Sequence, residues 1–288
     1  QKSVRLEVFR RTDVGSNFKK NRMKSENLQK FGIVIIESLP ENEKKTGYDL
    51  HSTIIQYKTF EFPDLASDFY DVNNKIDFFW LLNELARKAV EENYFFVLHM
   101  EMHGFNDGIE LKNGEEVTWG EMIPYFQEIN IHYQNYLLIV LGICEGASII
   151  KYTNPAERAP FRALISSEKK IYDKDFIPGF EEFYKHFFFE FDAVEALEKY
   201  NSVITDSKDK LLFVSAEYLF DQITDIKRPT ADRQKLRQIY SERLFWDFPD
   251  LKHFPKEYTE KYIDNEIEKA FGEVRTKKDY FLMKDLDV

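Results

Sequence analysis

Runs of consecutive apolar residues, separated by short polar stretches, recur along the first half of the chain. The run FGIVIIES (Phe31 to Ser38) is apolar on both faces, which is typical of a strand buried in a parallel sheet. The runs YFFVLHMEMHG (Tyr94 to Gly104) and YLLIVLGIC (Tyr136 to Cys144) have the same character. These three segments predict three core strands, the last two of which stop abruptly at His-Gly and at Cys.

The segments between and after these runs carry other periodicities. The stretch from Thr53 to Phe62 alternates and predicts a second strand, whereas 74–93 has apolar residues at helical spacing. Asn113-Gly114 lies between two alternating runs and predicts a hairpin. The remaining patterns predict a helix over 120–134, a strand within 160–171, a helix over 177–191 and helices from about Val194 onward.

Alternating strands and helices predict an α/β fold with a mostly parallel sheet flanked by helices, followed by a helical C-terminal region. Three parts are expected: a basic N-terminal segment (1–30), the sheet domain (31–193) and a helical extension (194–288), which the pattern alone does not separate from the sheet domain. The N-terminal segment carries nine Lys and Arg against three acids. Such a charge run is more often a solvated face than a binding site.

Composition removes several classes of function. The net charge of −11 argues against nucleic-acid binding, which needs clustered basic residues. No apolar run reaches the roughly 20 residues that span a bilayer. A single cysteine, with no signal-peptide pattern, predicts a reducing, cytoplasmic setting. No zinc-type Cys/His spacing and no phosphate-binding glycine loop is present, so no metal or cofactor is expected.

His103 and Cys144 both end predicted strands, and sites in parallel sheets form beyond the carboxyl ends of strands. A lone cysteine in a strand is most often a small buried hydrophobe. GICEG (Gly142 to Gly146) also fits the G-x-C-x-G elbow of cysteine hydrolases and amidotransferases, but that arrangement needs a histidine downstream and a helix directly after the cysteine. The third interpretation pairs Cys144 with the upstream His103.

The order of a strand ending in His-Gly and then a strand ending in Cys resembles the caspase-like superfamily of cysteine peptidases. The chain is most similar to the CHAT group of bacterial proteases. The resemblance covers roughly Phe31 to Phe191 and rests on LHMEMHG, Trp119 after a hairpin, EIN at the end of the next helix, LGICEG, and APFRALISS followed by FEEFYKHFF. Ile143 departs from the pattern, because many relatives have a small or polar residue before the cysteine.

The resemblance implies a cysteine endopeptidase with Cys144 as nucleophile and His103 as general acid and base. It also implies an oxyanion hole formed by the backbone N–H groups of Gly104 and Cys144. His99 lies deeper in the strand and is expected to be a hydrogen-bonded core histidine.

Charged residues near the dyad give two opposite expectations for specificity. Glu101, Asp107 and Glu145 could line a pocket for Arg or Lys, and equally could be ordinary turn residues. Lys44 and Lys45, after the first strand, would instead favour an acidic side chain.

Two classes of function stay open from the sequence. The first is a protease that cleaves a protein partner, which the resemblance connects with effectors or activators of bacterial antiviral defence that are switched on by a sensor. The second is a catalytically silent interaction module on the same fold, and in both cases the C-terminal helices could be the docking surface.

Overall fold

The computed structural model of this chain describes residues 30–62, 64–170, 176–190, 192–206, 210–224 and 230–286. The predicted basic segment 1–30 therefore lies outside the described residues, apart from Lys30. The chain divides into two compact units, the first formed by residues up to 153 together with 159–216, and the second by 154–158 together with residues from 217 onward.

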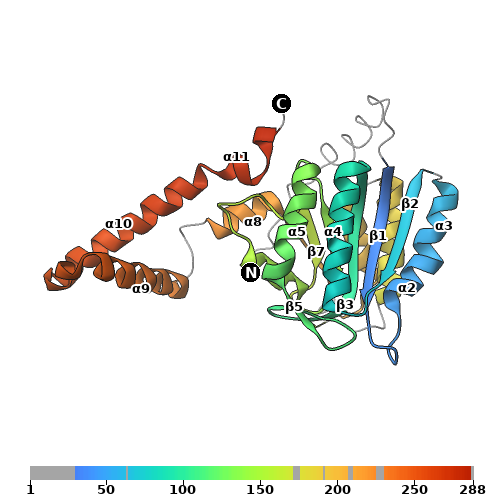
Figure 1. The fold of residues 1–288 in the computed structure, drawn as a ribbon, viewed down its shortest axis with the longest axis horizontal. Helices are drawn as coiled ribbons and strands as arrows, with labels where there is room; N and C mark the ends of the chain where they lie inside the picture. Colours follow the sequence, from blue (N-terminus) through green and yellow to red (C-terminus); the bar gives the residue numbers. More distant parts are fainter. Residues whose placement is uncertain are drawn as a thin grey trace. The chain divides into compact units, whose positions relative to one another are not determined.

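The first unit is a sheet with helices on both faces (Figure 1). Its strands and helices are, in order, β1 (Lys30–Ser38), α2 (Thr46–Leu50), a π-helical turn (His51–Ile55), α3 (Gln56–Glu61), β2 (Leu65–Asp71), α4 (Lys75–Glu91), β3 (Tyr94–Phe105), β4 (Gly108–Glu110), β5 (Glu116–Thr118), α5 (Trp119–His132), β6 (Leu138–Gly142), a 3-10 helix η2 (Gly146–Tyr152), β7 (Ala163–Ser166), α6 (Phe176–Glu190), α7 (Ala193–Val203) and β8 (Leu212–Ser215).

The strand order is β2-β1-β3-β6-β7-β8, in which all neighbours are parallel except the antiparallel pair of β7 and β8. The expected α/β class with a mostly parallel sheet is confirmed. Strands β4 and β5 form a hairpin that extends β3, with Gly114 of the predicted Asn-Gly pair at a φ of 85°. Helices α4 and α5 cover one face of the sheet (Figure 1).

Helix α6 packs a dense group of aromatic rings on the other face. Phe180, Phe183 and Tyr184 are fully buried against the sheet side chains Ile33 and Val140. Burying rings of this size provides much of the stabilisation of the first unit. The run FEEFYKHFFFE thus lies in a helix, as predicted, and that helix packs on the core.

The predicted strand from Thr53 to Phe62 is wrong, because this segment is helical. Within it only Ile55 is fully buried, and the other side chains are half-buried or exposed. The second strand is β2 instead. It is an edge strand that pairs only with β1 and is mostly half-exposed, so its sequence LASDFYD lacks a long apolar run.

The sheet unit also ends later than the expected boundary at 194. Helix α7 and strand β8 belong to it, and the Ala216 N–H donates to the Arg162 carbonyl at 2.9 Å. Strand β8 is only four residues long, so the prediction of helices from about Val194 onward missed it.

The second unit is helical in its described part. Its elements are α8 (Ala216–Ile223), α9 (Thr230–Asp247), a 3-10 turn η4 (Pro249–His253), α10 (Lys256–Arg275), α11 (Lys278–Phe281) and η5 (Lys284–Leu286). Asp264 of α10 accepts a hydrogen bond from Arg237 of α9 at 2.6 Å, and Phe281 packs on Phe220. Within the described residues, no helix is long and apolar enough to cross a membrane.

Candidate active site

The ends of β3 and β6 bring the His-Gly and Cys segments to the same edge of the sheet. The two strands are adjacent and parallel, and their last paired residues are Glu101 and Gly142. Two residues further along the chain are His103, still within β3, and Cys144, in the turn after β6. The pairing register therefore aligns the two residues that the sequence singled out.

Gly104 is in direct contact with the cysteine turn. A Cβ atom at this position would lie 2.2 Å from Ile143 Cγ2 and 2.5 Å from the Cys144 carbonyl oxygen. No real Cβ approaches other atoms this closely, so only glycine lets the two segments meet. The Gly104 backbone thus lies against the Ile143 side chain and the Cys144 carbonyl group.

Cys144 lies in a tight turn rather than within the core. It is half-buried, while its neighbour Ile143 is fully buried. The left-handed conformation falls on Glu145, with a φ of 56°, and the chain continues into the 3-10 helix η2. A nucleophile elbow requires the strained residue to be the nucleophile and a long helix to follow it, so the geometry does not favour the elbow interpretation.

His103 is held by a carboxylate that the sequence did not point to. The imidazole Nε2 lies 2.9 Å from Glu43 Oε2, and both side chains are partly exposed. A carboxylate can only accept, so Nε2 carries a proton, and in the neutral ring Nδ1 is left with its lone pair. Glu43 lies in the loop between β1 and α2, within the polar run ENEKK, where no spacing distinguishes it from its neighbours.

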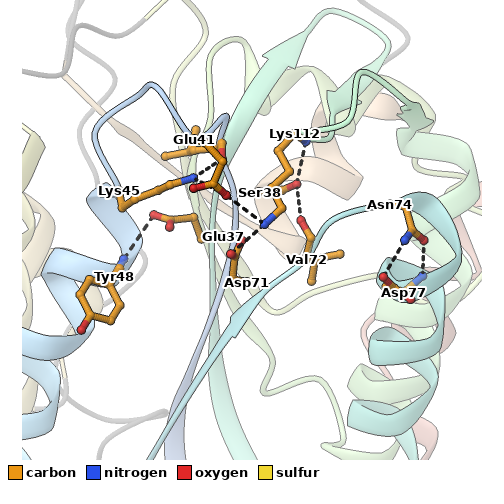
Figure 2. A network of polar contacts seen from close by, with 11 residues as sticks. Glu37, Ser38, Glu41, Lys45, Tyr48, Asp71, Val72, Asn74, Asp77 and Lys112 are labelled. Atoms are coloured by element: carbon orange, nitrogen blue, oxygen red, sulfur yellow. Dashed lines mark hydrogen bonds and ion pairs between the residues drawn. The ribbon is translucent and has the colours of Figure 1, made fainter.

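A set of polar contacts fixes the loop that carries Glu43 (Figure 2). Lys45 donates to the Leu39 carbonyl and lies 3.8 Å from Glu41. Lys112, which follows β4, lies 3.8 Å from Glu41 and pairs with Asp71 at the end of β2 at 2.7 Å. The loop is thereby tied to the ends of β1 and β2 and to the hairpin.

Glu37 anchors the other end of the same loop. Its Oε2 accepts from the backbone N–H groups of Gly47 and Tyr48, at 2.8 and 3.3 Å, in the first turn of α2. Burial raises the pKa of Glu37 to about 7. The two N–H donors oppose this rise, and the nearby Glu101 adds to it.

A buried chain of hydrogen bonds runs beneath this edge. His99 is fully buried, with Nδ1 2.8 Å from the Tyr184 hydroxyl and Nε2 2.7 Å from Glu101 Oε1, and Thr46 donates to Glu101 Oε2 at 3.1 Å. Burial lowers the pKa of His99 to about 3, so the ring is neutral at physiological pH. The expectation of a hydrogen-bonded core histidine is confirmed.

The three acidic residues proposed for a substrate pocket occupy different environments. Glu101 is 2% exposed and bonded to His99 and Thr46. Asp107 accepts a hydrogen bond from Tyr152 at 2.7 Å and belongs to the turn between β3 and β4. Glu145 is half-buried and directly follows Cys144, so of these three it is the one best positioned to meet a substrate.

The Glu101 carboxylate leaves no room for a side chain at position 142. A Cβ atom here would lie 2.6 Å from the Glu101 carboxylate carbon. The buried carboxylate therefore packs directly against the strand end that leads into Cys144.

In the described part of the chain no cluster of three or more His, Cys, Asp or Glu could hold a metal ion.

Comparison with models of protein families and with curated protein sequences finds no match for this chain.

Proposed function

We propose that the protein is a caspase-like cysteine endopeptidase in which Cys144 and His103 form the catalytic dyad. The observation that carries this proposal is the contact of the Gly104 backbone with Ile143 and Cys144 at the carboxyl edge of a parallel sheet. That contact joins the His103-Gly104 segment of β3 to the cysteine turn that follows β6, in the order that the caspase-like resemblance implies.

The reaction proceeds by acyl transfer. His103 Nδ1 takes the proton of the Cys144 thiol, and the sulfur attacks the scissile carbonyl carbon. Backbone N–H groups of Gly104 and Cys144 donate to the resulting oxyanion. The C–N bond then breaks as His103 gives its proton to the leaving amine. Water, deprotonated by His103, adds to the thioester and releases the acid and the thiol.

Glu43 acts as a positioning residue in this scheme. By accepting from Nε2 at 2.9 Å, it keeps Nδ1 available as the proton acceptor and stabilises the imidazolium that forms during attack. This arrangement supplies the third member that commonly orients a catalytic base.

The presence of a single cysteine makes the test direct, because alkylation of the folded protein reports on Cys144 alone. We expect iodoacetamide to react with Cys144 at neutral pH at least about 10-fold faster than with a free thiol, since only the thiolate is nucleophilic. His103→Ala should abolish this excess, while His253→Ala, which changes an exposed histidine of the second unit, should leave it intact.

Cleavage of a fluorogenic peptide library completes the test. Turnover that is lost in Cys144→Ala supports the endopeptidase. A thiol of ordinary reactivity that does not respond to His103→Ala would contradict it and favour the catalytically silent module.

Two wider features of the proposal rest on the resemblance alone. The enzyme would be a cytoplasmic effector or activator in a bacterial defence system, acting on a protein substrate. Its activity would be switched on by a sensor protein that docks on the C-terminal helices.

A further inference from the structure

We propose that Tyr152 and Asp107 are positioning residues of the dyad, which hold the turn that carries Cys144 against the strand end that carries His103. This inference rests on the proposed cysteine endopeptidase and adds two residues outside the dyad to it. The observation behind it is a set of hydrogen bonds between the turn after β3 and the 3-10 helix η2, which follows the cysteine turn.

His103 belongs to a short, tightly turned hairpin. Strand β3 pairs with β4 from His103 to Phe105, and Asn106 and Asp107 form the two-residue turn at the tip. The indole N–H of the fully buried Trp119 donates to the Asn106 carbonyl at 3.1 Å. The Trp119 backbone N–H donates to the Asp107 carbonyl at 3.0 Å. Because both tip carbonyls are held and the ladder begins at His103, the position of the tip determines that of the His103 backbone.

Three side chains of η2 reach this hairpin tip. Ser148, Lys151 and Tyr152 have the spacing i, i+3 and i+4, which puts them on one face of the short helix. The Lys151 ammonium and the Ser148 hydroxyl donate to Asn106 Oδ1, at 2.5 and 3.4 Å. The Tyr152 hydroxyl donates to Asp107 Oδ1 at 2.7 Å. We call these hydrogen bonds the tip contact.

The two segments that carry the dyad therefore meet at two places. One is the close approach of Gly104 to the Ile143 side chain and the Cys144 carbonyl group, and the other is the tip contact. One contact alone would leave the segments free to rotate about it, whereas two fix their relative orientation. Orientation matters here, because proton transfer between the imidazole and the thiol requires the two groups to be correctly placed.

The residue between Cys144 and η2 depends on such support. Glu145 has a φ of 56°, in the left-handed region that side chains other than glycine disfavour, and such a conformation persists only where surrounding contacts hold it. On one side, the backbone N–H groups of Glu145 and Ala147 donate to the carbonyls of Lys169 and Ser167, at 3.0 and 2.9 Å. The tip contact holds the other side. Its loss would let Glu145 relax and turn Cys144 away from the histidine.

Tyr152 is the member of the tip contact that can be altered most selectively. Its ring lies beside the start of α5, where a Cβ atom at Gly120 would be 3.9 Å from Tyr152 Cδ1. Tyr152→Phe keeps this ring and removes only the hydroxyl. The hydrogen bond to the Asp107 carboxylate raises the pKa of Tyr152, so the hydroxyl keeps its proton and donates throughout the neutral range.

Peptide cleavage and iodoacetamide kinetics on the full chain test the proposal. We expect Tyr152→Phe to lower kcat by about 10-fold with little change in KM, and to reduce the excess alkylation rate of Cys144. Asp107→Ala should have the same effect. Asp107→Asn keeps an oxygen that accepts from the Tyr152 hydroxyl and should restore most of kcat. Tyr70→Phe is the matched control, because it removes a hydroxyl that accepts from Lys88 at 3.1 Å, and it should change neither rate.

The possible outcomes separate this inference from the proposed function. Turnover and fast alkylation that Tyr152→Phe leaves unchanged would overturn the positioning role and keep the endopeptidase. An equal loss of kcat in Asp107→Asn and Asp107→Ala would also overturn it, since the hydrogen bond to Tyr152 would then not be what matters. If the original protein shows neither turnover nor fast alkylation, the proposed function fails and the positioning role fails with it.

Discussion

At the residue scale, the site depends on glycines whose missing side chains make room for other atoms. Gly142 stands where a Cβ would lie 2.6 Å from the buried Glu101 carboxylate. We predict that Gly142→Ala lowers the free energy of unfolding by about 1–3 kcal/mol, because the carboxylate is held by His99 and Thr46 and cannot move freely.

Urea unfolding followed by circular dichroism measures this loss. Gly120→Ala is the control, since the nearest atom to its new Cβ would be 3.9 Å away and alanine favours helix α5 by up to about 1 kcal/mol. A Gly142→Ala protein as stable as the original would contradict the prediction, because the Glu101 side chain would then be able to move aside.

Substitution of Glu43 tests whether this residue positions the catalytic base or only supports the structure. We predict that Glu43→Gln lowers kcat by about 10-fold or more with little change in KM, because the neutral amide stabilises the His103 imidazolium less. The pH profile of Cys144 alkylation should shift as well. Glu41→Gln, an exposed carboxylate in the same loop, should change neither measurement. An unchanged alkylation profile in Glu43→Gln would remove Glu43 from the mechanism.

Glu145 carries what is left of the predicted preference for basic residues. A single charge-assisted hydrogen bond of about 1.5–3 kcal/mol would favour Arg or Lys before the cleaved bond by roughly 10- to 100-fold. Peptides that differ only at this residue measure the preference, and Glu145→Gln should reduce it. Preference for aspartate would instead assign the selectivity to basic residues such as the exposed Lys44.

At the element scale, long buried segments were predictable and edge segments were not. Strands β1, β3 and β6 are buried on both faces, so their apolar runs are continuous and identify them. Strands β2 and β8 lie at the two edges of the sheet and need no such run. The segment around Ile55 alternates by chance, and only its packing as a helix reveals its state.

The same contrast holds for the candidate site. The order of strands was sufficient to predict that the segments carrying His103 and Cys144 lie at the same edge of the sheet, because parallel strands share a carboxyl edge. The link between Glu43 and His103 crosses sixty residues of sequence and depends on how one loop folds. Glu101 is bonded to Thr46 of α2 and to His99, whose other nitrogen bonds Tyr184 of α6, and no local pattern connects these helices with β3.

Glu37 joins β1 to α2 and makes this connection sensitive to pH. Its folded-state pKa is raised from 4.5 to about 7, so its protonated form is favoured by folding. Its contribution to stability is fully present below about pH 4.5 and is lost as pH rises through about 7. From the size of the shift, the loss is roughly 2–4 kcal/mol.

We therefore predict that Glu37→Gln gains stability relative to the original protein between pH 5 and pH 8. Urea unfolding at several pH values in this window measures the difference. Glu41→Gln, which changes an exposed carboxylate nearby, should differ from the original protein by the same free energy of unfolding at every pH. A constant difference between Glu37→Gln and the original would contradict the raised pKa.

At the scale of the whole molecule, the chain combines two units of different character. The first has the aromatic core beneath the sheet and contains every residue of the candidate active site. The second is helical in its described part and contains none of those residues. The proposed chemistry therefore belongs to the first unit.

This division predicts where the chain can be shortened. Strand β8 pairs with β7, and Asn201 of α7 bonds both the N–H and the carbonyl of Leu211, each at 3.0 Å. A chain ending at residue 216 keeps these contacts, whereas one ending at 203 loses β8 and exposes the edge of β7. The longer chain loses the ion pair of Arg158 with Asp285 and the contacts of Arg158 with the Tyr280 carbonyl and ring, all of which lie within the second unit.

We expect the chain ending at 216 to unfold cooperatively in urea and to keep the alkylation rate of Cys144. The chain ending at 203 should aggregate, because the unpaired edge of β7 can join another sheet. Size-exclusion chromatography and iodoacetamide kinetics on the two shortened proteins make the comparison. If both are insoluble, the helices after 216 are needed to fold the sheet, and the two units are one cooperative structure.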